Sequence, residues 1–233
     1  MIKVILWDVD GTLLDFKAAE KAAVKECFSL FGLGECTDEA VARYSAINDI
    51  WWERLERKEC TRAQTLVGRF RDFFEAEGID ASVAEAFNVQ YQNRLGDTIC
   101  FCDNSFTLLE KLKGSVLQCA VTNGTKIAQD KKLNKSGLIR LFDHIFISED
   151  IGAVKPDTDF FEKVWSAIGR YGRDEVLIVG DSLTSDIKGG NNAGILSCWY
   201  NPKGAVNTKD ARPDYEIGNL WQVEDILRGG AES

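Results

Sequence analysis

The stretch that decides the fold is Ile2-Lys3-Val4-Ile5-Leu6-Trp7-Asp8-Val9-Asp10-Gly11-Thr12. It begins with a short apolar run, and a run of this length bounded by a turn signal is typical of a buried strand. Asp8 and Asp10 therefore stand at the carboxyl end of a core strand, where open α/β sheets place their ligands. Both side chains point to the same side of such a strand, so their carboxylates repel each other unless a cation or a shared proton relieves the charge. The alternative is an Asp-Gly turn that only ends the strand.

The composition of the 233-residue chain is that of an ordinary globular protein, long enough for a core domain with an insertion. Its net charge of −9 disfavours a nucleic-acid polymer as partner, because phosphate backbones are bound by a surplus of lysine and arginine. No stretch approaches the roughly 20 apolar residues of a membrane span, so no membrane partner is expected. A signal-peptide pattern is also absent, and seven scattered cysteines without a CxxC motif are typical of reduced thiols. We therefore expect a cytoplasmic protein, and the pattern makes no prediction of oligomeric state.

Residues 16–95 differ in character from the rest of the chain. Helical patterns replace the short β-branched runs there, and four helices are predicted without any strand pattern. This predicts an inserted all-helical domain over residues 16–95, with residues 1–15 and 96–233 forming an α/β core domain. Two of the helices carry capping boxes at their starts, Thr61 with Gln64 and Ser82 with Glu85.

After residue 95, short apolar runs return and alternate with helical patterns. Strands are predicted at residues 116–121, 145–148, 176–179 and 196–200. Strands that alternate with helices imply right-handed βαβ units and a parallel sheet. The predicted fold class is therefore α/β, with a Rossmann-like parallel sheet covered by helices on both faces.

Polar side chains gather where the predicted strands end. Thr122 and Asn123 follow the second strand, Lys155 lies in the loop after the third, and Asp181 and Asp186 follow the fourth. The carboxyl ends of parallel strands meet at one edge of a sheet, so a single crevice can collect all of these side chains.

The chemistry that this set permits is phosphoryl transfer. Three carboxylates around one point suit magnesium, which prefers oxygen ligands, and Lys155 supplies a compact positive charge for phosphate. Asp8 can attack phosphorus to form an aspartyl-phosphate, and Asp10 can move the protons. The one histidine, His144, stands at the start of a predicted strand, which disfavours a Ser-His-Asp mechanism.

Four motifs of the chain resemble those of the haloacid dehalogenase superfamily of phosphohydrolases. They are, in the order and spacing of that family, Asp8-x-Asp10-Gly11-Thr12, Thr122-Asn123-Gly124, Lys155-Pro156 and Gly180-Asp181-(x)4-Asp186. The resemblance covers essentially the whole chain, and it implies that residues 16–95 are the helical cap that these enzymes insert after the first motif. The dehalogenase branch is disfavoured because its members lack the second aspartate, present here as Asp10.

The resemblance also implies roles for the residues that match the motifs. Asp8 would be the nucleophile and a magnesium ligand, and Asp10 would be the acid/base with its backbone carbonyl on the metal. Asp181 would be a metal ligand and Asp186 would support the metal's ligand set. The remaining implied roles are phosphate binding by Thr122 and Asn123 and neutralisation of charge by Lys155.

Further segments resemble the pyrimidine 5′-nucleotidases that act on non-canonical nucleotides. They include Asn48-Asp49-Ile50-Trp51-Trp52 and Gly68-Arg69-Phe70 in the predicted cap. Asn48, Arg69 and Trp52 are therefore candidate substrate contacts, although packing on amphipathic helices explains the aromatic residues and a surface ion pair explains the arginine. The expected substrate is a small phosphate ester, a nucleoside 5′-monophosphate above all. The alternatives left open are a sugar-phosphate or phosphoglycolate-type phosphatase, a phosphomutase, and a non-catalytic phosphate-sensing module.

Overall fold

The computed structural model describes residues 1–169 and 171–229. The chain divides into two compact units, which we call the core unit and the helical unit. The core unit comprises Met1–Asp15, Phe101–Lys126 and Ser136–Ser233, and the helical unit comprises Phe16–Cys100 and Ile127–Lys135. Within the described ranges, no helix combines the length and the apolar character that crossing a membrane requires.

The core unit is built on one six-stranded sheet in which all paired strands are parallel. The strand order is β3-β2-β1-β4-β5-β6, which confirms the predicted Rossmann-like α/β fold. The bounds of the strands are β1 Val4–Trp7, β2 Leu117–Thr122, β3 His144–Ile147, β4 Val176–Gly180, β5 Leu196–Tyr200 and β6 Tyr215–Ile217. The sequence did not predict β6, a strand of three residues at the edge of the sheet.

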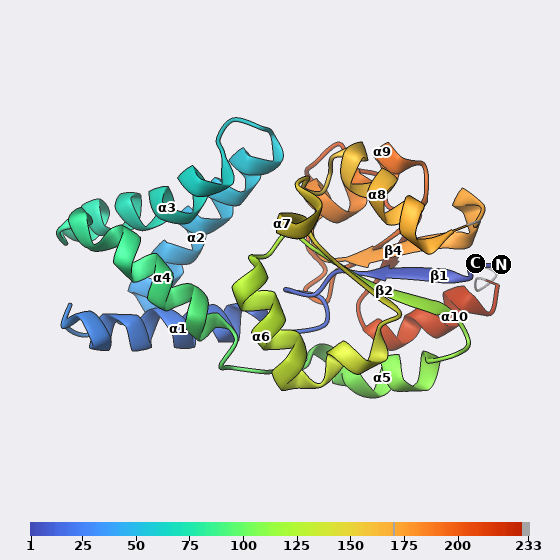
Figure 1. Ribbon diagram of the computed structural model, residues 1–233, viewed down its shortest axis with the longest axis horizontal. Coiled ribbons are helices and arrows are strands. Elements are labelled where there is room, and N and C mark those ends of the chain that lie inside the picture. The colour runs from blue at the N-terminus through green and yellow to red at the C-terminus, as the bar shows by residue number, and fades with distance from the viewer. Residues whose placement is uncertain (170, 230–233) are drawn as a thin grey trace. The chain divides into compact units, whose positions relative to one another are not determined.

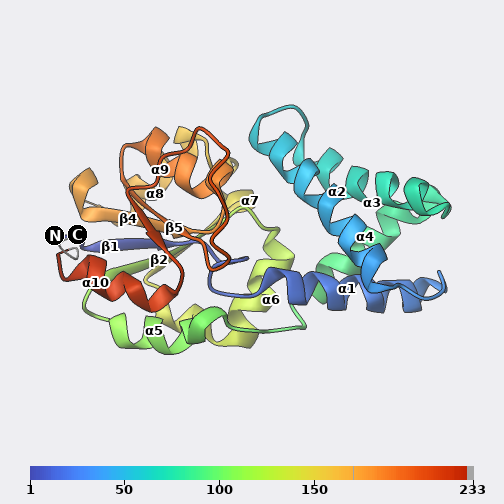
Figure 2. The ribbon, with the colours of Figure 1, turned by 180° about the vertical axis from the view of Figure 1, so that it is seen from behind.

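Helices cover both faces of the sheet, as predicted (Figures 1 and 2). Helices α5 and α10 lie on one face, and α8 and α9 lie on the other. Buried side chains of β1 and β4 pack against α8, as Val4 and Ile178 do with Phe160 and Val164. The helices of the core unit are α5 Ser105–Leu112, α7 Ser148–Ile151, α8 Thr158–Ile168, α9 Lys188–Ala193 and α10 Val223–Leu227.

Strand β1 is central to this sheet because it pairs with β2 on one side and with β4 on the other. All four of its side chains are buried, as its continuous apolar run predicts. Trp7 is level with Ala120 of β2 and with Val179 of β4, so the three strands end close together. The next backbone amide, that of Asp8, still donates to the carbonyl of Val179 at 2.9 Å. The register therefore carries Asp8 to the edge where β2 and β4 also finish.

The helical unit contains α1 Phe16–Phe31, α2 Asp38–Glu56, α3 Arg62–Glu77 and α4 Ala84–Leu95, together with most of α6 Lys126–Ser136. It is larger than the predicted insertion, because it continues to Cys100 and takes in residues 127–135. Two contacts explain the difference. Ala128 belongs to the apolar cluster of this unit, and the Lys131 ammonium donates to the carbonyl of Asn93 at 2.7 Å.

The start of α3 confirms one predicted capping box and the start of α4 contradicts the other. The Thr61 hydroxyl accepts from the Gln64 amide at 3.3 Å, and the Gln64 side chain accepts from the Thr61 amide at 2.8 Å. Ser82 does not cap α4, because Asp80 accepts both its backbone N–H at 2.9 Å and its hydroxyl at 2.7 Å. A short 3-10 turn over Ala81–Val83 therefore precedes α4.

Aromatic rings fill the interior of the helical unit. Phe70 is fully buried, and its ring lies 4.9 Å from that of Tyr44, 4.9 Å from that of Phe87 and 5.1 Å from that of Tyr91. These residues come from α2, α3 and α4, so one side chain joins three helices. Offset-stacked and edge-to-face ring pairs add to the stabilisation that burial of the rings provides.

We predict that Phe70→Ala lowers the free energy of unfolding by about 3–5 kcal/mol, because it leaves a cavity where three helices meet. Val89→Ala is the control in α4, since Val89 is 56% exposed and its replacement should change stability by less than about 0.5 kcal/mol. Urea denaturation followed by circular dichroism measures both effects. A loss for Phe70→Ala as small as that of the control would contradict the packing described.

Candidate active site

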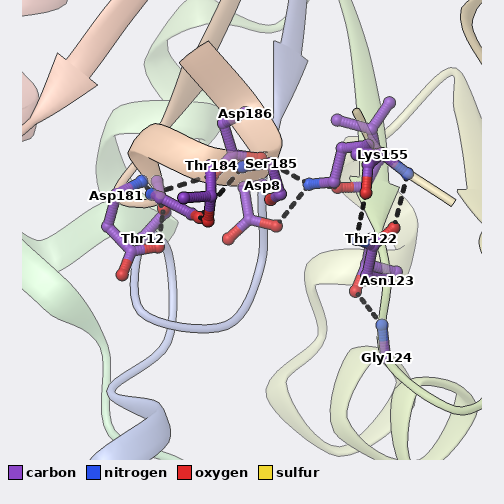
Figure 3. A network of polar contacts seen from close by, with 12 residues as sticks. Asp8, Thr12, Thr122, Asn123, Gly124, Lys155, Asp181, Thr184, Ser185 and Asp186 are labelled. Carbon is purple, nitrogen blue, oxygen red and sulfur yellow. Dashed lines mark hydrogen bonds and ion pairs between the residues drawn. The ribbon is translucent and has the colours of Figure 1, made fainter. Parts of the chain in front are cut away.

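The structure brings the core residues of the predicted site to one edge of the sheet (Figure 3). Asp8 follows β1 directly, Thr122 is the last residue of β2, and Asp181 follows β4. Lys155 lies in the loop after α7, and Asp186 lies on a π-helical turn over Leu183–Ile187. The carboxyl ends of the strands therefore collect these residues, as their positions after the predicted strands indicated.

Lys155 is the centre of this group. Its side chain is 1% exposed, and its ammonium donates to Asp8 Oδ1 at 2.7 Å, Asp186 Oδ1 at 2.6 Å and the carbonyl oxygen of Val121 at 2.8 Å. An ammonium group has three N–H donors, so all of them are used. Burial alone lowers the pKa of Lys155, but the carboxylates of Asp186 and Asp8 outweigh it and raise that pKa above its ordinary value. The lysine therefore stays charged between two aspartates.

The backbone of Lys155 is fixed by the residues at the end of β2. The Asn123 side chain accepts from the Lys155 amide at 2.8 Å and donates to the Lys155 carbonyl at 2.8 Å. The hydroxyl oxygen of Thr122 accepts from the Gly124 amide at 3.0 Å, which leaves the hydroxyl proton to serve as a donor. Asn123 thus ties the loop of Lys155 to the sheet.

Three carboxylates meet beside this lysine. One oxygen each of Asp8, Asp181 and Asp186 lies within 4.8 Å of the other two. Burial, aided by the charges of Asp186 and Asp181, raises the pKa of Asp8 well above its ordinary value despite the opposing effect of Lys155. Burial of its carboxyl group and the neighbouring Asp186 raise the pKa of Asp181 to about 7, although the residue as a whole is exposed. One lysine does not balance three negative charges, so the cluster favours either a proton or a cation.

The donor set of the cluster fits a hard divalent cation. Carboxylate oxygens are the ligands that magnesium prefers, and a divalent cation relieves the repulsion that raises these pKa values. Asp10 lies in the turn beyond β1, where the Gly11 amide donates to the Leu14 carbonyl at 2.8 Å, and the residue is partly exposed.

Thr12 is a residue of the site to which the sequence analysis gave no role. Its hydroxyl oxygen accepts from the Asp181 amide at 3.0 Å, and its O–H donates to Asp181 Oδ1 at 3.2 Å. Gly11 leaves room for that contact, because a Cβ atom there would lie 2.5 Å from Asp181 Oδ2. The position of Thr12 in the first motif was the signal for its role.

Asp186 is oriented as firmly as Asp181. Its Oδ2 accepts from the Ser182 amide at 3.1 Å while its Oδ1 accepts from Lys155. A Cβ atom on Gly180 would come within 2.2 Å of this carboxyl group, so only glycine fits at the end of β4. The carboxylate faces inward and is 1% exposed.

The candidate residues of the helical unit form a polar network of their own. Asn48 and Arg69 are each 1% exposed, and Arg69 donates to Asn48 Oδ1 at 2.8 Å and to Asn88 Oδ1 at 3.1 Å. The indole of Trp52 donates to the same Asn48 oxygen at 3.1 Å, and the Asn48 amide donates to Glu20 at 3.1 Å. These contacts join the candidates into one network, and their binding of substrate stays a prediction.

Known proteins resemble the chain over almost its whole length. The family model described as haloacid dehalogenase-like hydrolase matches residues 5–200. The HAD-hydrolase YfnB of Bacillus subtilis is 36% identical over 97% of this chain and 95% of its own. A crystal structure of YfnB bound to magnesium has a TM-score of 0.91 at 35% identity and covers 97% of this chain and 98% of its own.

Two relatives are named as pyrimidine 5′-nucleotidases. PynA of Streptococcus pneumoniae is 34% identical over 97% of this chain and 94% of its own. YjjG of Escherichia coli is 28% identical over 96% of each chain. The parallel sheet and the match to hydrolases over almost the whole chain show that the protein is an α/β enzyme. The chain belongs to the haloacid dehalogenase-like hydrolase family, which confirms the resemblance of its four motifs.

We predict that, in the absence of metal, the stability of Asp181→Asn relative to the wild type increases as the pH rises. The pKa of Asp181 is raised from 3.8 to about 7, so the folded protein holds this proton more tightly than the unfolded chain does. The resulting stability is complete below the unfolded pKa and is lost as the pH rises through about 7. Asparagine does not ionise. The difference in melting temperature between the variant and the wild type should therefore increase by roughly 3 °C from about pH 5 to about pH 8. This value is reduced because solvent screens the charge of the exposed Asp181.

Thermal unfolding in the presence of a chelator measures this difference. Asp159→Asn is the control, because Asp159 is an exposed carboxylate in the first turn of α8. Its melting temperature relative to the wild type should not change with pH. A difference for Asp181→Asn that stayed constant or shrank with rising pH would contradict the repulsion described for the cluster.

Proposed function

We propose that this protein is a magnesium-dependent phosphomonoesterase that hydrolyses pyrimidine nucleoside 5′-monophosphates through an aspartyl-phosphate. The observation that carries the proposal is the bridge made by Lys155 between Asp8 and Asp186. This bridge orients Asp8 beside a cluster of oxygen ligands and places a fixed positive charge where a phosphate would gather negative charge.

The proposed magnesium site consists of the Asp8, Asp181 and Asp186 carboxylates, with Asp10 contributing its backbone carbonyl. Magnesium, when bound, supplies the positive charge that offsets the carboxylates and polarises a phosphoryl oxygen. The crystal structure of YfnB, which is bound to magnesium, supports the same cofactor for this chain.

In the first step, Asp8 attacks the phosphorus of the substrate. Lys155 holds Oδ1 of Asp8, and Oδ2 forms the new bond to phosphorus while the bond between phosphorus and the ester oxygen breaks. Asp10 gives a proton to the departing ester oxygen, so the product leaves as an alcohol. The Thr122 hydroxyl, whose proton is available, donates to a phosphoryl oxygen.

In the second step, water attacks the phosphorus of the aspartyl-phosphate. Asp10 takes a proton from this water, and the bond between Asp8 and phosphorus breaks to release inorganic phosphate. Lys155 again neutralises the Asp8 carboxylate as it is freed. The Asn123 side chain keeps the lysine in place by holding both polar groups of its backbone.

Relatives and the helical unit support the proposed substrate class. PynA and YjjG are named as pyrimidine 5′-nucleotidases and match almost the whole chain, the helical unit included. Asn48, Arg69 and Trp52 are the candidate contacts to the base or the sugar, in a unit that acts as a cap domain. A cap of this kind excludes water during the first step and selects the leaving group.

A phosphate-release screen with purified protein tests the proposal. The panel contains pyrimidine and purine nucleoside 5′-monophosphates, sugar phosphates and phosphoglycolate, each with magnesium and then with a chelator. We expect the highest kcat/KM for a pyrimidine nucleotide, and chelation should reduce it by about a hundredfold or more. Asp8→Asn should remove turnover on every substrate, whereas the surface variant Asp159→Asn should retain it.

Other results of this screen would each contradict one part of the proposal. Substantial magnesium-dependent activity of Asp8→Asn would contradict the nucleophile. Preference for a sugar phosphate or phosphoglycolate would contradict the substrate, and an isomerised sugar phosphate with little free phosphate would indicate a mutase. No turnover on any ester would favour a non-catalytic phosphate-sensing module.

A further inference from the structure

A tryptophan outside the four motifs contacts the backbone of a proposed metal ligand. Trp199 lies in β5, is 5% exposed, and donates its indole N–H to the carbonyl oxygen of Asp181 at 3.0 Å. Trp199 is level with Gly180 in the pairing of β4 with β5, so the ladder ends one residue before Asp181. The indole therefore supplies the hydrogen bond that the sheet no longer provides there.

The backbone amide of Asp181, which belongs to the preceding peptide unit, is also held by a side chain. The Asp181 amide donates to the hydroxyl of Thr12, which comes from the turn after β1. The N–H of Asp181 is thus bound by Thr12 of the first motif, on the β1 side of β4. Its C=O is bound by Trp199 of β5, on the other side of β4. With both groups fixed, the backbone of Asp181 has little freedom to turn its carboxylate away from Asp8 and Asp186.

The ring of Trp199 also supports the turn that carries Asp186. Trp199 forms a small apolar cluster with Ile187 and Ala211, and Leu183 packs against that cluster. Leu183 and Ile187 are the first and last residues of the π-helical turn that contains Asp186. One side chain therefore contacts the structure around both carboxylates that follow β4.

We propose that Trp199 is a positioning residue that sets the geometry of the Asp181 and Asp186 carboxylates for a divalent cation, with Thr12 as its counterpart on the other side of Asp181. The inference rests on the proposed magnesium site. Groups that orient metal ligands in this way contribute strongly to affinity, because each ligand must otherwise be ordered when the cation binds.

The test is direct binding of magnesium to the substrate-free protein by isothermal titration calorimetry. Trp199→Phe keeps most of the ring and removes the indole N–H, so the dissociation constant for magnesium should rise by about tenfold. Trp221→Phe is the matched control, because the Trp221 indole donates to the Asp103 carbonyl at 2.8 Å elsewhere in the core unit. The control should bind magnesium within about twofold of the wild type.

A second pair of variants covers the case in which Trp199→Phe does not fold. Thr12→Val removes the hydrogen bonds of the Thr12 hydroxyl to the amide and the carboxylate of Asp181 and should weaken magnesium binding, whereas Thr12→Ser keeps the hydroxyl and should restore it. With saturating magnesium, Trp199→Phe should recover most of the wild-type kcat, since the nucleophile is untouched.

The outcomes separate this inference from the proposed function. If the wild type binds no magnesium, the metal site itself is wrong. If the wild type binds magnesium and Trp199→Phe binds it equally well, or loses no more than Trp221→Phe, the positioning role is overturned and the proposed function stands. Equal affinities of Thr12→Val and Thr12→Ser would also overturn it.

Discussion

The buried Lys155 ammonium between Asp8 and Asp186 is the interaction on which the core unit's functional edge depends. Removing one partner from a buried ion pair leaves an uncompensated charge and costs about 3–5 kcal/mol, so these three residues require one another. Asp8 follows β1, Asp186 lies on the turn after β4, and Lys155 follows β3. The pair distances of 2.7 and 2.6 Å hold only if those three segments end at the same edge of the sheet.

The same arrangement leaves a surplus of negative charge. Lys155 neutralises part of the charge, and the remaining repulsion raises the pKa values of Asp8 and Asp181. A site with this surplus of negative charge binds a divalent cation more strongly than a balanced one, at the expense of stability in the cation's absence. Hydrogen bonds to Thr12 and Trp199 hold the backbone of Asp181 beside this cluster, although the residue is exposed.

The sequence predicted the elements that carry a clear local pattern. It failed at a very short strand, at a helix start where two carboxylates compete, and at a side-chain contact between neighbouring strands. The strand before Asp8 and the edge that collects Lys155 followed from apolar runs and their polar ends. Strand β6 did not, because a three-residue strand has no periodicity and forms only by pairing with β5. The helix cap predicted at Ser82 does not form, because the nearby Asp80 carboxylate accepts a hydrogen bond from the Ser82 amide. The contact of Trp199 with Asp181 joins separate strands, and no spacing rule reveals such a hydrogen bond.

The most direct test of the account is chemical trapping of the covalent intermediate. The enzyme is mixed with a pyrimidine nucleoside 5′-monophosphate and magnesium, quenched during turnover, and treated with borohydride, which reduces an aspartyl-phosphate to homoserine. Peptide mass spectrometry then locates the reduced residue. The account predicts homoserine at position 8 and none in a sample quenched without substrate. Steady turnover with an unmodified Asp8, or reduction at another carboxylate, would contradict it.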